Sequence, residues 1–194
     1  MEHTRRTLSV VAAAGMLMLA ACNGDPEATP PPTTSSPPPP TPSASTPSTP
    51  PKPTPPAIPP AATNGLTVTS AEAFARFYLT VVDYAEGSGD SALLRRYADR
   101  ECIVCDALAK TYEQTYSNGG AVTGDFHTRN VHVSAARLVG ADTATVAISG
   151  SEGSSKWRKS RQANVVSFPP HRVSWDLTLA AANGHWAMFA MVRK

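Results

Sequence analysis

Few of the residues that carry familiar protein chemistry are present in this sequence. It has three cysteines in 194 residues, with no second cysteine pair and no closely spaced histidines, so a structural zinc site would lack ligands. The G-x-S-x-G pattern of a nucleophile elbow does not occur. The formal net charge is only +2, which argues against nucleic acid as a partner. We therefore expect no metal, no other cofactor and no nucleic-acid partner.

The one long apolar run lies at the N-terminus, and it is too short to cross a bilayer permanently. Arg5 and Arg6 precede the run LSVVAAAGMLMLAA, an arrangement typical of an export signal. The run ends in LAAC, which resembles a bacterial lipobox and implies cleavage before Cys22 and lipid attachment to its thiol. We predict a signal peptide over 1–21 and a palmitate-bearing lipoprotein on the extracytoplasmic face of the cell membrane. A simple cleavage site followed by a chance cysteine is the alternative.

Residues 22–64 are predicted to form a disordered linker. Of the 19 prolines, 17 lie between Pro26 and Pro60, and Ile58 is the one large apolar side chain of this stretch. Such a composition cannot bury a core, and its proline content favours an extended chain that rises ~3.1 Å per residue. The segment would hold a domain away from the membrane. A recognition segment for proline-binding domains is the alternative.

The remaining residues, 65–194, suffice for one domain with its own core. Thr69 and Glu72 fit a capping box, and apolar residues then recur at helical spacing up to the segment EGSGD. A second helix, SALLRRYA, follows Asp90, and a third begins near 105–106 and stops at the C-cap signal NGG. The predicted buried face of the first helix consists of Phe74, Phe77, Tyr78, Val81, Val82 and Ala85.

The second half of this domain switches to strand patterning. Short segments rich in Val and aromatic residues alternate with turn residues, and Asn183-Gly184 is the strongest hairpin signal. The last segment is apolar on both faces, which predicts a central strand covered on each side. About three helices followed by a curved, mainly antiparallel sheet predict an α+β fold. The predicted strands are RNVHVSAARLV, DTATVAIS, QANVVSF, RVSWDLTLAA and HWAMFAMVR.

The order of these parts is similar to that of actinobacterial lipoproteins carrying a domain of unknown function, numbered 6318. The resemblance rests on AEAFARFYLTVVDYAEGSGDSALLRRYADRECIVC, on the helix ending YSNGG and on the strand-rich tail. It covers residues 65–194, together with the lipobox and the spacer. The family in turn resembles the cone-shaped nuclear transport factor 2 and SnoaL-like fold, in which a curved sheet wraps a long helix and leaves a pocket. The resemblance implies a fold and a location, and no activity.

Lipidation of Cys22 would leave Cys102 and Cys105 as an even pair outside the cytoplasm. Their spacing across a helix junction allows the Cα separation of a disulfide. We therefore predict a disulfide bond that stabilises the fold by roughly 2 kcal/mol. A thioredoxin-type redox centre also places C-x-x-C at a helix start, but that motif should follow a β-strand and here it follows a predicted helix. A metal site would need two further ligands.

Polar and aromatic side chains would line the mouth of such a cone. A carboxylate whose pKa is raised by an apolar pocket could act there as a base, as a SnoaL-like enzyme requires. The alternative is that the tyrosines pack in the core and the acids are solvated. The histidines, including His171 after Pro169-Pro170, are expected to be solvated or simply hydrogen-bonded. The candidate pocket residues are Asp83, Tyr84, Tyr112, Trp175 and Asp176.

The segment SSKWRKSRQ is predicted to be a hairpin loop. Its basic side chains could touch anionic headgroups or wall polymers, with an aromatic side chain as a foot. A soluble surface loop is the alternative. The residues concerned are Lys156, Trp157, Arg158, Lys159 and Arg161.

Three functional hypotheses follow, and no catalytic residue is identified for any of them. A non-catalytic domain that binds a small apolar ligand or another envelope protein predicts a pocket lined mainly by aromatic side chains, without a convergent pair of titratable groups. A SnoaL-like cyclase, isomerase or hydratase predicts an Asp or His deep in the cone with a strongly shifted pKa. A thiol oxidoreductase predicts a reducible, exposed Cys102.

Labelled palmitate should enter the wild-type protein in its native envelope and be absent from Cys22→Ala, because the Cys22 thiol is the attachment atom in a lipobox. The measurement is the label recovered in the immunoprecipitated protein. Label retained by the variant at the wild-type level would show that acylation does not depend on Cys22.

Overall fold

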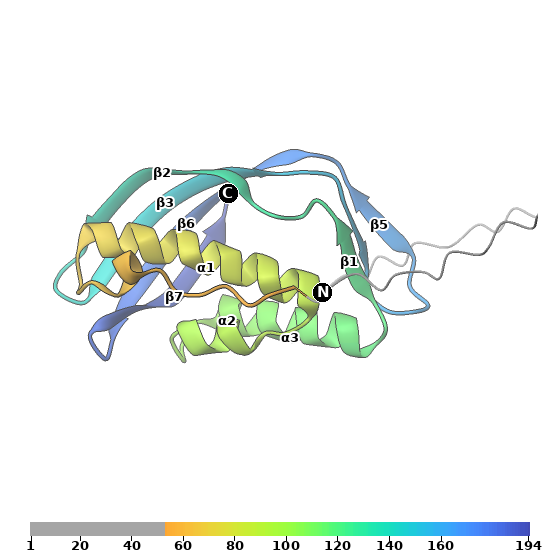
Figure 1. Ribbon diagram of the computed structural model, residues 1–194, viewed down its shortest axis with the longest axis horizontal. Helices are drawn as coiled ribbons and strands as arrows, with labels where there is room; N and C mark the ends of the chain where they lie inside the picture. The colour runs from red at the N-terminus through yellow and green to blue at the C-terminus, as the bar shows by residue number, and fades with distance from the viewer. Residues whose placement is uncertain (1–52) are drawn as a thin grey trace, which may run out of the picture. The chain divides into compact units, whose positions relative to one another are not determined.

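Residues 53–194 are described by a computed structural model (Figure 1). The predicted signal peptide, Cys22 and the linker up to residue 52 lie outside the described residues. Three helices, α1 (Val68–Ser88), α2 (Ala92–Tyr97) and α3 (Ile103–Ser117), precede the strands. They pack against two antiparallel sheets, which confirms the predicted α+β class. The strands are β1 (Ala121–Gly124), β2 (Arg129–Leu138), β3 (Thr143–Glu152), β4 (Ser155–Arg158), β5 (Val165–Phe168), β6 (His171–Ala182) and β7 (His185–Arg193).

Helix α1 lies between the four-stranded sheet β2-β3-β6-β7 and the pair α2 and α3 (Figure 1). All six side chains predicted for its buried face are buried. The helix ends where predicted, at Gly89, whose φ of +73° is a left-handed C-cap that glycine adopts without strain. A side chain there would also collide with the ring of Tyr116 on α3. No helix within residues 53–194 combines the length and hydropathy needed to span a bilayer.

The N-terminal cap of α1 differs from the prediction. The cap is Thr67, whose hydroxyl accepts a hydrogen bond from the Ser70 backbone N–H at 3.1 Å, and the predicted pair Thr69 and Glu72 lies inside the first turns. The Ser70 hydroxyl completes the box and also donates to the Gly65 carbonyl at 2.7 Å. It further accepts the indole N–H of Trp186 on β7 at 3.0 Å. The pattern Thr-x-x-Glu pointed to Thr69, whereas the box uses Ser70 at the third position in place of the usual Glu or Gln.

The predicted linker gives way to the folded domain earlier than residue 65. A 3-10 helix, η1 (Pro60–Thr63), contacts α1 and β7. Ala62 is 1% exposed, and Ile58 packs against the core. The folded domain therefore begins before residue 65, because both side chains pack on apolar surface of the domain. The proline-rich composition of this stretch gave no sign of these contacts.

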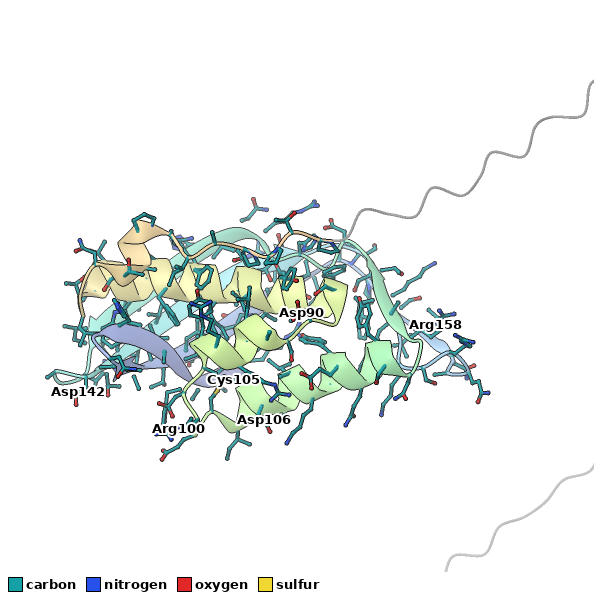
Figure 2. All side chains as sticks on the ribbon, turned by 60° about the horizontal axis from the view of Figure 1, so that its bottom comes forward. Asp90, Arg100, Cys105, Asp106, Asp142 and Arg158 are labelled. Atoms are coloured by element: carbon teal, nitrogen blue, oxygen red, sulfur yellow. A yellow bond between two sulfur atoms is a disulfide. The ribbon has the colours of Figure 1, made fainter. Side chains whose placement is uncertain are left out.

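Helices α2 and α3 are joined by a short loop that brings Cys102 and Cys105 together. Their sulfur atoms lie at disulfide distance, and their Cα atoms are 5.3 Å apart. Helix α3 begins at Ile103, slightly before the predicted start, with Cys102 as its N-cap residue. Figure 2 shows Cys105 and Asp106 at this end of α3. Cys102 follows α2 and Cys105 lies in the first turn of α3, and both are 2% exposed, so Cys102 is not the exposed thiol expected of an oxidoreductase.

The last strand is an edge strand, which corrects the prediction of a central one. Strand β7 pairs only with β6 along its length, and its open side is partly covered by the loop after α2, where the Asp99 N–H donates to the Met188 carbonyl at 2.7 Å. A register shift opposite Thr178 and Leu179 leaves Phe189 outside the ladder, so Met188 and Met191 both face the core. Phe189 and Val192 are therefore exposed. The hairpin at Asn183-Gly184 is confirmed, with φ of 51° and 79°.

The second sheet, β1-β4-β5, was not predicted as a unit. Strand β4 lies in its centre and pairs antiparallel with both neighbours. Its residues belong to the segment that was expected to be a hairpin loop. Gly120 precedes β1, and a Cβ atom there would come within 2.1 Å of the Arg158 carbonyl oxygen, so only glycine lets the two chains approach.

Ser70→Ala should destabilise the domain by about 1–3 kcal/mol, because it leaves the buried indole N–H of Trp186 without its acceptor and removes half of the capping box. Thr69→Ala is the matched control in the same turn, and it should change the free energy of unfolding by less than about 0.5 kcal/mol. Urea denaturation followed by circular dichroism measures both. Equal stability of the two variants would contradict the role given to Ser70.

Candidate functional site

A cavity of about 360 Å³ is lined by residues of both sheets and of helices α1 and α3, and we call it the inter-sheet cavity. Its charged lining groups come from the C-terminal part of α1 and from the ends of β3, β6 and β7. Its aromatic lining groups come from α3, β4 and β5. The charged residues are Glu86, Glu152, His171 and Arg193, and the aromatic residues are Tyr112, Trp157 and Phe168.

A larger hollow of about 510 Å³ lies over β3 and β6, with Thr145, Ala147 and Asp176 among its lining residues. These side chains alternate with buried Val146 and Leu177, so they point away from the core. The outward side chains of this hollow are small apart from Asp176 and Arg137, and no aromatic side chain lines it. The inter-sheet cavity, which joins titratable groups to aromatic walls, is the better candidate site.

Glu86 is an acid of the inter-sheet cavity that has no strong partner among residues 53–194. Its carboxylate receives one long hydrogen bond, from the Tyr112 hydroxyl at 3.4 Å. The neighbouring Tyr116 hydroxyl donates to the Glu86 backbone carbonyl at 2.8 Å and so fixes this turn of α1 against α3. Burial raises the pKa of Glu86 to about 7, and the negative charges of Glu152 and Asp83 push it the same way. Near neutral pH, Glu86 can therefore either hold or release a proton.

His171, Glu152 and Arg193 form a second cluster in the inter-sheet cavity. The His171 Nδ1 lies 3.0 Å from the Pro169 carbonyl, and its Nε2 lies 2.7 Å from the Arg193 guanidinium. In the neutral ring these contacts assign the proton to Nδ1, which donates to Pro169, and leave Nε2 to accept from Arg193. The same Nε2 lies 3.2 Å from the Glu152 carboxylate, and Arg193 lies 3.9 Å from it. Arg193 thus donates to His171 and lies near Glu152, whose carboxylate accepts no hydrogen bond from His171 in this tautomer.

Asp83 lies one turn before Glu86 on α1, next to the inter-sheet cavity but outside its lining. Its carboxylate accepts hydrogen bonds from the Thr128 backbone N–H at 3.0 Å and the Thr128 hydroxyl at 3.3 Å. Burial raises the pKa of Asp83 to about 6, although these hydrogen bonds and the nearby His127 lower it in part. Asp83 and Glu86, two carboxyl groups with raised pKa values, therefore both lie near the C-terminal end of α1.

The structure brings one of the five candidate pocket residues, Tyr112, into the inter-sheet cavity, and it places Asp83 beside it. Tyr84 is buried elsewhere, and its hydroxyl donates to Asp90 at 2.9 Å. Trp175 packs against the core under the Arg193 guanidinium, 5.4 Å from its ring centre, and its indole N–H has no hydrogen-bond partner within residues 53–194. Asp176 points outward and pairs with Lys194 at 2.6 Å.

The sequence interpretation missed Glu86, Glu152, His171 as a site residue, and Arg193. A signal for Glu86 existed, because it continues the buried stripe of Ala75, Leu79 and Val82 at helical spacing. Glu152 and His171 are direct partners across β3 and β6, 19 positions apart in the chain, and no local pattern marks such a pair.

The basic residues of the predicted loop have two different surroundings. Lys156, Arg158, Lys159 and Arg161 are exposed, and Figure 2 shows Arg158 at the end of the described unit opposite Asp142. Trp157 instead faces the inter-sheet cavity, and its indole N–H donates to the buried Thr115 hydroxyl at 3.3 Å. Trp157 therefore does not form an exposed aromatic foot. Contact of the four cations with anionic material stays a prediction.

The inter-sheet cavity differs from the pocket expected of a purely apolar binding domain. Aromatic side chains line it, but Glu86, Glu152 and His171 converge in it as well. In residues 53–194 no group of three or more His, Cys, Asp or Glu side chains is arranged to hold a metal ion. The arrangement can transfer protons near neutral pH, and it can bind a molecule with both a polar head and an apolar body.

Solved structures show where this fold occurs elsewhere. The intermembrane space region of the chloroplast protein ARC6 is similar at 12% identity with a TM-score of 0.55, over 66% of this chain and 96% of that one. A Streptomyces avermitilis protein of the NTF2-like family matches at 15% identity with a TM-score of 0.38, over 61% of this chain and 92% of that one. A search of curated proteins finds no match. The likeness to the ARC6 region indicates a shared fold and says nothing about chemistry.

Glu86→Gln should remove a pH-dependent loss of stability. A carboxyl group whose folded pKa is about 7, against an ordinary value of 4.5, binds more protons in the folded chain, so stability falls as the pH rises between these values. The variant should come close to the wild type near pH 4 and exceed it by roughly 1–3 kcal/mol at pH 8. Urea denaturation at both pH values measures this.

Glu72→Gln, on the same helix and outside the inter-sheet cavity, is the matched control and should show no such pH-dependent difference. Asp83 is present in all three proteins, so its own titration cancels in the comparison. A Glu86→Gln effect of constant size from pH 4 to pH 8 would contradict the raised pKa.

Proposed function

Since this chain belongs to the family of unknown function DUF6318, whose model matches residues 41–190, we propose its function from the inter-sheet cavity. The protein is a lipid-anchored cell-envelope protein whose folded domain binds a small molecule with a polar head and an apolar body. The observation that carries the binding role is a cavity of about 360 Å³ in which aromatic walls meet an acid without a strong partner.

Two features support the envelope location. The sequence places LAAC before a proline-rich stretch, which is the order expected of a lipid anchor followed by a spacer. Cys102 and Cys105, the two remaining cysteines, lie at disulfide distance, which fits an oxidising compartment. The palmitate experiment on Cys22 tests the anchor.

The volume and lining of the inter-sheet cavity support the binding role. Small-molecule sites typically span ~300–1,000 Å³ and combine apolar walls with a few polar groups. Here Leu108, Val122 and Phe168 supply apolar surface, and Glu86 supplies a polar group aimed at the same space. Burial raises the pKa of Glu86, so a partner that stabilises its charged form would bind favourably there.

An enzyme that works by general acid–base catalysis is the second candidate. The observation that favours it is the meeting of Glu86, whose pKa lies near 7, with the Tyr112 hydroxyl in one cavity. Glu86 would accept a proton from a bound substrate, and Tyr112 would donate a hydrogen bond. Mass analysis of each bound compound before and after incubation separates the two candidates, because only an enzyme alters its ligand, and Glu86→Gln should abolish that change.

Ligand-observed NMR with a library of small fragments should find compounds that bind the wild-type protein and not Thr111→Trp. Thr111 lines the inter-sheet cavity from α3, so an indole at this position fills the space. Gln114→Trp, exposed on the same helix, is the control and should bind as the wild type does. We expect at least a tenfold loss of affinity in Thr111→Trp, equivalent to about 1.4 kcal/mol. Fragments that bind all three proteins equally would refute the cavity as the binding site.

A further inference from the structure

Resting on the proposed binding role, we propose that the ligand of the inter-sheet cavity is an organic cation: its ammonium head lies against Glu86 and Glu152, and its apolar body lies against the aromatic walls. Both the charge distribution around the cavity and the nature of its walls point to this class of compound.

Acids outnumber cations around the polar end of the inter-sheet cavity. Glu86 and Glu152 line it, and Asp83 lies one helical turn from Glu86. The positive charge that faces them is that of Arg193, whose side chain is 48% exposed, whereas the Glu152 side chain is 18% exposed. Water therefore screens the guanidinium more than it screens the acids. The buried part of the site has an excess of negative charge.

The contacts within residues 53–194 show which acids lack strong partners. Asp83 accepts two hydrogen bonds from Thr128. Glu152 has the Arg193 guanidinium at 3.9 Å, and the His171 Nε2 at 3.2 Å carries no proton for it in the tautomer assigned above. Glu86 receives one long hydrogen bond, from the Tyr112 hydroxyl at 3.4 Å. A neutral ligand can give Glu86 one hydrogen bond, but only a cation also offsets the repulsion among the three carboxylates.

The walls of the inter-sheet cavity suit the same class of ligand. Tyr112, Trp157 and Phe168 line it, and a cation over an aromatic face gains ~0.5–2 kcal/mol when water is excluded. Arg193 has taken such a position over Trp175, at 5.4 Å from the ring centre. Within residues 53–194 the aromatic rings nearer Glu86 carry no such protein cation, so they are available to a ligand.

An anionic ligand is the competing class, and the structure disfavours it. The Arg193 guanidinium donates to the His171 Nε2 at 2.7 Å and lies near Glu152, so its charge already has partners. In the tautomer assigned above, His171 offers its N–H to the Pro169 carbonyl and not to the cavity. An anion would have to break these contacts and approach Glu86 as a like charge.

Three probes with one skeleton test the inference in the full-length mature protein: phenethylammonium, 2-phenylethanol and phenylacetate. Isothermal titration at pH 7.5 should show phenethylammonium binding at least about tenfold more tightly than 2-phenylethanol, since one pKa unit of interaction with Glu86 corresponds to a factor of ten. Phenylacetate should bind most weakly. Repeating the titration in buffers of different ionisation enthalpy should reveal net proton release on binding of the cation, because the ligand charge lowers the pKa of Glu86.

Glu86→Gln should reduce phenethylammonium affinity about tenfold, abolish the proton release and leave 2-phenylethanol binding unchanged within a factor of about two. Glu72→Gln is the matched control and should behave as the wild type. The proton release is measured on the wild-type protein alone, so the test does not depend on how the variant folds.

The outcomes separate this inference from the proposed function. If 2-phenylethanol binds as tightly as the ammonium and both are lost in Thr111→Trp, the cavity binds ligands but the cation inference is wrong. If phenylacetate binds most tightly, Arg193 governs recognition and the inference is again wrong. If no probe binds in a manner sensitive to Thr111→Trp, the inference fails, and the fragment screen decides the binding role.

Discussion

The burial of α1 is the constraint on which the rest of the structure depends. Phe74, Tyr78, Val81 and Ala85 are each 1% exposed or less, because the four-stranded sheet covers one side of the helix and α2 and α3 cover another. Full burial of such side chains contributes ~1.5–3 kcal/mol for each large one. The apolar pattern ends at Ala85, and the next residue is Glu86. The helix therefore passes directly from the core into the region between the two sheets, and its last turns carry acids into a space that the core does not fill.

The remaining groups reach the same place through the antiparallel order of the sheet. Glu152 is the last residue of β3, His171 is the first of β6, and Arg193 is the last of β7. In an antiparallel sheet the end of one strand lies beside the start of its neighbour, so these three residues meet at the same end of the sheet. From that end of the sheet the chain continues into β4 and β5 of the second sheet, which contribute Trp157 and Phe168 to the site. The site therefore lies where strands of the four-stranded sheet end and the chain continues into strands of the second sheet.

Local sequence patterns predicted the elements of this domain better than they predicted its site. Helical periodicity identified the buried face of α1, and the dipeptide Asn183-Gly184 identified the last hairpin, because both depend on residues close together in the chain. The prediction of a central last strand was wrong, because the edge position of β7 depends on contacts between distant segments, and the predicted capping box of Thr69 and Glu72 was wrong as well. For the same reason Tyr112 was selected as a pocket residue from its type alone, whereas the pairing of Glu152 with His171 required the register of β3 and β6.

Position 86 shows most clearly that this region does not serve stability alone. Ala75, Leu79 and Val82 precede it on one stripe of α1, so an apolar residue would continue the core at no electrostatic cost. An acid there is desolvated and repelled by Glu152 and Asp83. The surface acids Asp106 and Glu113 meet no such penalty, since they share Arg95 in water and their pKa values are lowered. Folding gains nothing from a buried, weakly paired acid, and natural proteins tolerate such costs mainly at functional sites. Within residues 53–194, Arg193 offsets the charge of Glu86 only in part, since the pKa of Glu86 stays raised to about 7, and we assign the remaining part to a ligand.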